Sequence, residues 1–280
     1  MSIDLHIHTT ASDGDVDPVS IIHLVAEGGL KIIAISDHET TSGYYPAAQE
    51  GKLYGINVIP GVELLTGYKG REVHLLGYLL DPDNKHLQME LAELRNLRNT
   101  CARNIVDMLQ KYGFEITWSE VRGMARNDGP VSKGHIIQAL NRAGYIKDRS
   151  DASNILIKYL NPGGLAYITP DFAFEDAVEL IKDVGGIPVL AHPGLIRDDE
   201  MVAELCTKGI EGMEVYYYYF GQFREERVKY YDEKAETLKL LKTGGSDYHG
   251  TYTKVILGQN PVPFEGVKDF LKLFGVSQKF

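Results

Sequence analysis

The 280-residue chain is poor in cysteine, which excludes some common ways of stabilising a fold or binding a metal. Its only two cysteines, Cys101 and Cys206, stand in unrelated sequence contexts. They predict neither a disulfide framework nor a cysteine-based zinc site, and a reducing, cytoplasmic location is the expectation. The sequence also shows no signal-peptide pattern and no apolar run long enough to span a bilayer, so we expect no membrane partner.

Basic residues are also outnumbered. Lysine and arginine total 29 against 39 aspartates and glutamates, which gives a formal net charge of −10. A protein that binds duplex nucleic acid usually presents a basic face, so we expect no duplex partner. Bound divalent cations could still make one pocket locally positive.

Three widespread catalytic motifs are missing as well. The chain has no Walker phosphate loop, no Gly-x-Ser-x-Gly element and no dinucleotide-binding glycine fingerprint, which argues against NTPase, serine hydrolase and dehydrogenase functions. What it has is 44% hydrophobic residues, spread over predicted strands and helices. This content supports one large α/β domain, or such a domain with an insert.

The N-terminal segment carries the first sign of chemistry. Apolar and polar residues alternate over residues 3–8, a pattern that predicts a short β-strand. Side chains two apart in a strand share a face, so His6 and His8 point the same way. Two imidazoles before a turn that contains Asp13 resemble half of a metal site, although they could also be two half-exposed strand histidines.

Similar polar clusters follow two predicted strands. Residues 30–35 form an apolar strand that leads into Asp37 and His38, and residues 56–62 form a strand that ends in Glu63. The active sites of parallel α/β folds lie at the C-terminal ends of strands, so these side chains should meet the N-terminal histidines. Asp37 could orient an imidazole or cap the next helix. Glu63 could bridge two metals or form an ordinary salt bridge.

Three more clusters complete the set. His74 lies within a predicted strand, and a later apolar strand delivers His192 at its end. Asp247 and His249 stand two apart in a glycine-rich stretch, which repeats the spacing of the first histidine pair. A lone histidine such as His74 is more often a buried core residue, but in this company we favour a ligand.

Together these clusters supply nine candidate ligands, all with nitrogen or oxygen donors. We expect the same nine to be both metal-binding and catalytic: His6, His8, Asp13, His38, Glu63, His74, His192, Asp247 and His249. One ion takes roughly four to six ligands, so the set indicates two or three metals that share a carboxylate. Mixed imidazole and carboxylate ligation suits zinc, manganese or iron and does not suit calcium. Such clusters typically serve phosphoester hydrolysis.

The middle of the chain has a different character. A long helix is predicted over residues 87–112, and the segments that follow, to about residue 164, are short, helical and polar. We interpret residues 96–164 as an inserted helical subdomain, a cap over the substrate. The main domain then consists of residues 1–95 and 165–280.

The ordered set of clusters resembles the PHP (polymerase and histidinol phosphatase) family of metal-dependent phosphoesterases. The matching pieces are His6-Ile7-His8, Ser12-Asp13-Gly14, Ser36-Asp37-His38, Pro60-Gly61-Val62-Glu63, His74, Ala191-His192-Pro193 and Gly245-Ser246-Asp247-Tyr248-His249-Gly250. The resemblance implies an α/β fold, a distorted (β/α)7 barrel, with a trinuclear site at the strand C-termini. It also implies three ligand sets: His6, His8, Glu63 and Asp247; Glu63, His74 and His192; and Asp13, His38 and His249.

The insert makes the chain similar to a stand-alone branch of that family. Gly163-Gly164-Leu165-Ala166-Tyr167 is similar to the Gly-Gly-Pro-Ala-Tyr stretch of that branch, and Ser132-Lys133-Gly134-His135 stands where the branch carries Gly-Arg-Pro-His. Lysine at that place keeps a positive charge but lacks the two-pronged donor of arginine. The residues expected to contact the substrate phosphate are Arg98, Lys133 and His135.

The resemblance implies a phosphatase that acts on AMP or on a 3′,5′-bisphosphorylated nucleoside through a metal-activated water. The alternatives within the class are a 5′-3′ exoribonuclease acting on short single-stranded oligonucleotides and a histidinol-phosphate phosphatase, against which the insert argues. The alternative from a different class is a noncatalytic metal-binding domain that serves a partner protein.

Overall fold

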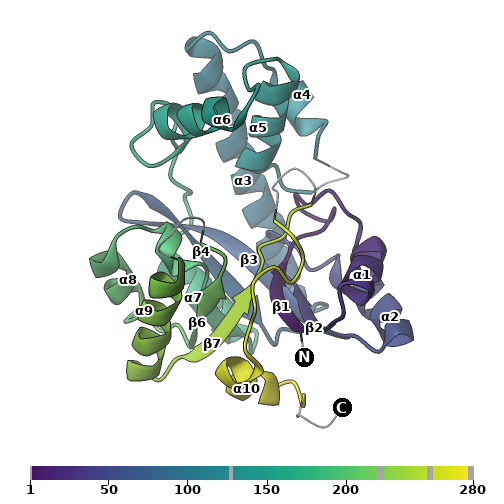
Figure 1. Ribbon diagram of the computed structural model, residues 1–280. Helices are drawn as coiled ribbons and strands as arrows, with labels where there is room; N and C mark the ends of the chain where they lie inside the picture. The colour runs from purple at the N-terminus through teal and green to yellow at the C-terminus, as the bar shows by residue number, and fades with distance from the viewer. Residues whose placement is uncertain (1, 126–128, 220–223, 251–254, 277–280) are drawn as a thin grey trace.

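A seven-stranded sheet rolled into a nearly closed barrel forms the body of the molecule (Figure 1). The computed structural model describes residues 2–125, 129–219, 224–250 and 255–276. The strands are neighbours in chain order: β1 (Ser2–Ile7), β2 (Leu30–Ile35), β3 (Asn57–Tyr68), β4 (Arg71–Tyr78), β5 (Ile187–Leu190), β6 (Gly212–Tyr217) and β7 (Leu241–Gly245). A bridge between Ile7 and Tyr248 brings the chain after β7 back to β1. The predicted distorted (β/α)7 barrel is confirmed.

Strand β4 accounts for the distortion, because it runs antiparallel to both β3 and β5 while the other paired strands are parallel. The beginning of β4 therefore lies at the rim where parallel strands end, and this places His74 there. The prediction that β3 ends in Glu63 is wrong. Glu63 lies inside β3, because β3 and β4 continue pairing as a hairpin up to Tyr68 and Arg71. Lys69 and Gly70 between them both have positive φ, as a tight hairpin turn requires.

Helices pack around this sheet: α1 (Pro18–Glu27), α2 (Tyr44–Tyr54), α7 (Phe174–Asp183), α8 (Asp199–Leu205), α9 (Arg224–Thr237) and α10 (Phe264–Lys272). Helix α9 ends at Thr237, a few residues before Leu241–Gly245 forms β7. The Lys-Thr-Gly-Gly sequence of β7 has low strand propensity and gave no strand signal. Among the described residues, no helix is both long and apolar enough to cross a bilayer.

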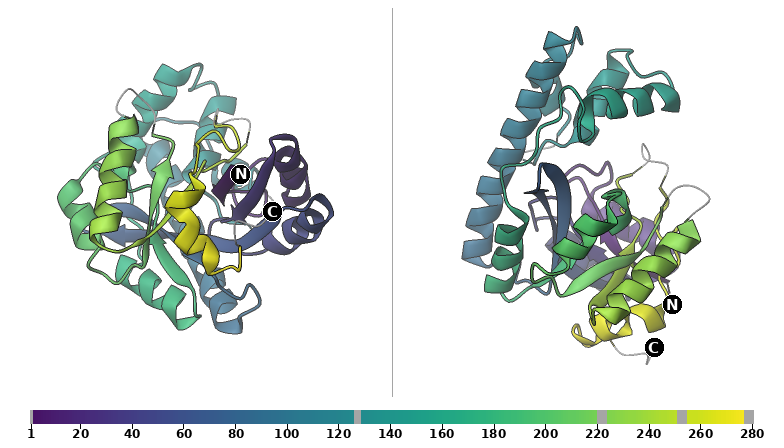
Figure 2. Two further views of the ribbon diagram at one scale, coloured as in Figure 1. Left: turned by 60° about the horizontal axis from the view of Figure 1, so that its bottom comes forward. Right: turned by 90° about the vertical axis from the view of Figure 1, so that its left-hand side faces the viewer.

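Residues above the barrel rim form a second, helical layer (Figure 2). It contains the upper part of α3 (Lys85–Lys111) and α4 (Trp118–Arg122), α5 (Lys133–Arg142), α6 (Arg149–Ile155) and the π-helical turn η1 (Leu156–Leu160). The first half of α3 contributes Leu87, Leu91 and Leu94 to the barrel core. Its second half packs in a separate apolar cluster with α4, α5 and η1. One unbroken helix therefore belongs to two hydrophobic cores.

Candidate metal centre and adjoining cavity

All nine predicted ligands lie at one end of the barrel. Their ligand atoms come within 4.8 Å of one another in three groups: His6, His8, Glu63 and Asp247; His8, Asp13, His38 and His249; and His38, Glu63 and His74. His192 joins through Glu63, since its Nε2 lies 3.1 Å from Glu63 Oε1. The first group coincides with one of the expected ligand sets. The second group adds His8 to an expected set, and the third contains His38 in place of His192. The division of ligands among ions therefore stays a prediction.

The Glu63 carboxylate lies at the centre of these groups. Its Oε2 atom is 3.2–3.3 Å from ring nitrogens of His6, His8 and His38. Its Oε1 atom is 2.9 Å from His74 Nδ1 and 3.1 Å from His192 Nε2. Each oxygen thus faces a different set of imidazoles, which is the arrangement of a carboxylate that bridges two cations.

The side chains present fit divalent metal ions. Nε2 of His6 and Nε2 of His8 are 3.1 Å apart, and each lies 3.3–3.4 Å from Asp247 Oδ1. Ligands about 2.0–2.1 Å from a tetrahedral ion are separated by about 3.3 Å, so these spacings match. Among the described residues, the buried His8 Nδ1, His38 Nδ1 and Asp247 Oδ1 atoms make no hydrogen bond of acceptable geometry, although each has an ion-pairing neighbour. Buried polar atoms rarely stay unsatisfied, and a bound cation would satisfy them.

The electrostatic field of the centre favours positive charge. Burial alone would raise the pKa of Glu63, but the imidazoles of His74, His38 and His6 lower it well below its usual value. Burial alone would lower the pKa of His74, yet Glu63 and Glu72 raise it to about 10. Asp13 and Asp247 likewise outweigh burial and raise the pKa of His249 to about 9. The carboxylates that favour protonated histidines here would also attract divalent cations, and a bound cation would displace the protons.

Glu214 on β6 is a site residue that the sequence analysis missed. It is fully buried, and its Oε1 lies 2.9 Å from His6 Nδ1, on the side of the ring away from the ligand cluster. Its Oε2 accepts a hydrogen bond from the backbone N–H of His192 at 2.8 Å. Carboxylates in this position fix the tautomer and orientation of metal-binding histidines. The sequence feature that could have revealed Glu214 is an acidic residue inside the otherwise apolar strand Gly212–Tyr217.

Two further groups support the centre. The Tyr217 hydroxyl donates to Asp247 Oδ2 at 3.0 Å. Within the part of the chain that the structure describes, Asp37 neither bonds an imidazole nor caps a helix. It accepts hydrogen bonds from the backbone and hydroxyl of Thr9 and from the hydroxyl of Ser12. Asp37 therefore shapes the turn that presents Asp13. His192 and Asp247 have φ of 25° and 56°, a strained conformation for non-glycine residues that tends to occur at functional sites.

The three predicted phosphate-binding residues have different surroundings. Lys133 at the start of α5 forms an ion pair with Glu72, at 2.6 Å. Arg98 on α3 is buried and donates to both oxygens of Glu39, at 2.9–3.0 Å. His135 is buried, and its Nδ1 accepts the backbone N–H of Ser132. Contact with phosphate stays a prediction for all three.

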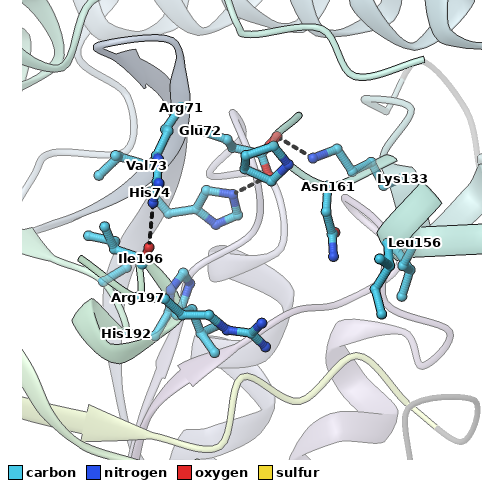
Figure 3. Close-up of a pocket in the computed structure, with 14 residues that line it drawn as sticks. Arg71, Glu72, Val73, His74, Lys133, Leu156, Asn161, His192, Ile196 and Arg197 are labelled. Atoms are coloured by element: carbon cyan, nitrogen blue, oxygen red, sulfur yellow. Dashed lines mark hydrogen bonds and ion pairs between the residues drawn. The ribbon is translucent and has the colours of Figure 1, made fainter. Parts of the chain in front are cut away.

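A cavity of 710 Å³ opens between the rim and the helical layer, next to the ligand cluster (Figure 3). His74 and His192 form part of its wall. The cationic residues Arg71, Lys133 and Arg197 also line it, and Glu72 contributes the carboxylate bonded to Lys133. Its volume is typical of a small-molecule site. A cation-lined cavity in an acidic protein suits an anionic ligand.

A barrel with a histidine and carboxylate cluster at its rim, beside an anion-suited cavity, defines a metal-dependent hydrolase of phosphoric esters. The chain belongs to the PHP domain family, whose profile matches residues 4–175. It is 32% identical to the 5′-3′ exoribonuclease Rnm of Escherichia coli, over 94% of this chain and 92% of that protein.

Two other proteins support the same class. The 3′,5′-nucleoside bisphosphate phosphatase of Chromobacterium violaceum is 29% identical, over 89% of this chain and 87% of that protein. A solved structure from Bifidobacterium adolescentis, described as a metal-dependent phosphoesterase, superposes with a TM-score of 0.82 at 29% identity. The match covers 99% of this chain and 97% of that one. The exoribonuclease and the bisphosphate phosphatase act on phosphoric ester bonds, and the chain is an enzyme of that class.

Proposed function

We propose that the protein releases phosphate from a nucleotide, either AMP or a 3′,5′-bisphosphorylated nucleoside, with the help of two or three bound manganese, iron or zinc ions. The observation that carries the proposal is the position of Glu63, whose two oxygens face separate sets of imidazoles. The similarity to a nucleoside bisphosphate phosphatase supports the substrate class. The adjoining 710 Å³ cavity has room for a nucleotide.

The nine ligands would hold the ions, and Glu63 would be shared between them. Ions bound there supply Lewis-acid chemistry, which polarises the phosphate and makes a water molecule acidic. Glu214 holds the His6 ring in one orientation, and Tyr217 does the same for the Asp247 carboxylate. Lys133 at the cavity wall would balance phosphate charge when the substrate enters. Residues 96–164 would act as the substrate cap over the barrel domain of residues 1–95 and 165–280.

A second candidate function is 5′-3′ exoribonuclease activity on short single-stranded RNA. It is favoured by the 32% identity to the Escherichia coli exoribonuclease over 94% of this chain. Both functions use the same phosphoester chemistry and differ in what is attached to the phosphate. Histidinol phosphate and a purely metal-binding role are the remaining alternatives.

The test is hydrolysis by the purified protein with manganese, and with a chelator as the control, measured as phosphate release from the monoesters and as mononucleotide formation from the oligonucleotide. The substrates are AMP, adenosine 3′,5′-bisphosphate, histidinol phosphate and a 5′-phosphorylated trinucleotide. We expect chelator-sensitive release from AMP or the bisphosphate. Preferred cleavage of the trinucleotide to mononucleotides would favour the exoribonuclease, and turnover of none of the four would favour the noncatalytic metal-binding domain.

A further inference from the structure

Two exposed aliphatic side chains line the 710 Å³ cavity, one from the helical layer and one from the barrel. Ile157 belongs to η1 in the helical layer and is 66% exposed, and Leu195 follows His192 on the barrel and is 47% exposed. Leu156 lies beside Ile157 on the same wall. Exposed aliphatic area costs free energy that a ligand with an apolar surface would recover. The cavity therefore offers an apolar slot as well as cations.

The local backbone indicates that the upper wall is adapted for binding. Leu156–Leu160 is a π-helical turn, a rare conformation that is frequent at functional sites. Asn161 ends the turn, and its side chain points into the cavity (Figure 3). The side-chain amide of Asn161 makes no hydrogen bond to any residue that the structure describes. One uncommitted amide thus stands beside two aliphatic side chains.

The cationic side chains of the same cavity indicate where the phosphate end of a ligand would bind, away from the aliphatic residues. His74 and His192 connect it to the metal centre, and Lys133 lies on that side next to Glu72 (Figure 3). Arg197 extends into the cavity from the barrel wall, and within the described residues its guanidinium forms no ion pair. A matching ligand would have an anionic end for the cations and a flat apolar end for the aliphatic side chains. The edge of that flat end would carry polar atoms for the Asn161 amide.

We propose that Leu156, Ile157 and Leu195 form a nucleobase slot, and that the Asn161 amide bonds the edge of the base. This inference rests on the proposed function and deepens it, because it explains why a nucleotide binds in preference to a simpler sugar phosphate. The aliphatic walls contact the base faces without reading base identity. The slot selects for the presence of a base.

The experiment compares AMP with ribose 5-phosphate, which has the same ribose and phosphate ester but lacks the base. Release of phosphate is measured for the wild type, Leu195→Ser and Ile157→Ser, all loaded with manganese. We expect the wild type to prefer AMP, and each serine variant to lower the ratio of kcat/KM for AMP over ribose 5-phosphate about tenfold, through KM for AMP. Leu53→Ser, at a 77% exposed position on α2, is the matched control and should keep the wild-type ratio.

Two results would refute the proposed nucleobase slot. One is a ratio that stays at the wild-type value in both serine variants. The other is an equal loss on both substrates, which would show that these side chains only support the wall. If the wild type hydrolyses neither compound, AMP is excluded as its substrate independently of the slot, and equilibrium binding of AMP and of ribose 5-phosphate is measured instead. A preference for AMP that Leu195→Ser removes then supports the slot, and a preference that it leaves intact refutes it.

Discussion

The barrel and the helical layer hold their polar residues in different ways. At the barrel rim each ligand is fixed by several neighbours: Glu63 alone contacts five imidazoles, and Glu214 supports both His6 and the backbone of His192. Across the junction, by contrast, Lys133 and Arg98 each bind one carboxylate of the barrel. This difference leads us to expect that metal binding at the rim and substrate binding at the junction can be changed independently. Changes on the two sides should therefore affect different measurements.

The largest effect is expected from Glu63→Gln. The amide cannot supply a negative oxygen to each of two cations, so metal content and activity should both fall, the latter by more than the roughly 100-fold seen for outer-shell partners. Elemental analysis and phosphate release are the measurements. Glu50→Gln is the matched control, because Glu50 also pairs with a histidine, His23 at 2.9 Å, but far from the cluster. Full metal content in Glu63→Gln would contradict the bridging role.

Arg98→Met tests the junction between the two regions. It leaves the Glu39 carboxylate buried without its partner, which should lower the free energy of unfolding by about 3–5 kcal/mol. Denaturant titration measures this, and Arg103→Met, at an exposed position on the same helix, should cost far less. Adding Glu39→Gln to Arg98→Met should restore part of the lost stability. A wild-type midpoint in Arg98→Met would show that the pair contributes nothing.

Glu214→Gln tests whether the hydrogen bond between Glu214 and the His6 ring positions that predicted ligand. Loss of this carboxylate should weaken metal affinity or activity about 10–100-fold, because the His6 ring is no longer held in one orientation. Glu211→Gln changes a solvent-exposed residue just before the same strand and serves as the control. The defect should shrink at high manganese concentration if the role is positioning. An unchanged metal titration would refute it.

Lys133→Ala should have the smallest effect and a different signature. Removing its charge from the cavity wall should raise KM about tenfold, a value typical of one charged contact, while metal content stays at the wild-type level. Lys147→Ala, on an exposed part of the helical layer, is the comparison. Loss of bound metal in Lys133→Ala would mean that the lysine acts through Glu72 on His74 and not on the substrate.

The spacing of side chains along the chain predicted much of the site. His6 with His8 and Asp247 with His249 were visible as two-residue repeats, and strand ends located His38 and His192. These signals are local. What escaped prediction depends on contacts between distant segments: the reversed direction of β4, the continuation of β3 past Glu63, and the use of Glu214 by a residue 208 positions away.

The helical layer was harder to predict for a related reason. Its polar residues reveal their partners only when α3 is set against the barrel, as with Arg98 and Glu39, which are 59 positions apart. An arginine on a polar helix face is usually solvated, and in this fold it is buried. Likewise, nothing in the sequence around Leu156 predicted a π-helical turn.

The unbroken helix α3 has a mechanical consequence. About 13 residues of α3 extend beyond Arg98, a lever of roughly 20 Å at 1.5 Å rise per residue. A tilt of about 10° at its base would therefore shift the far end by roughly 3–4 Å. The distance between the helical layer and the barrel rim should therefore depend on the tilt of one stiff helix anchored in the barrel, in contrast to the flexible loops that gate many enzymes.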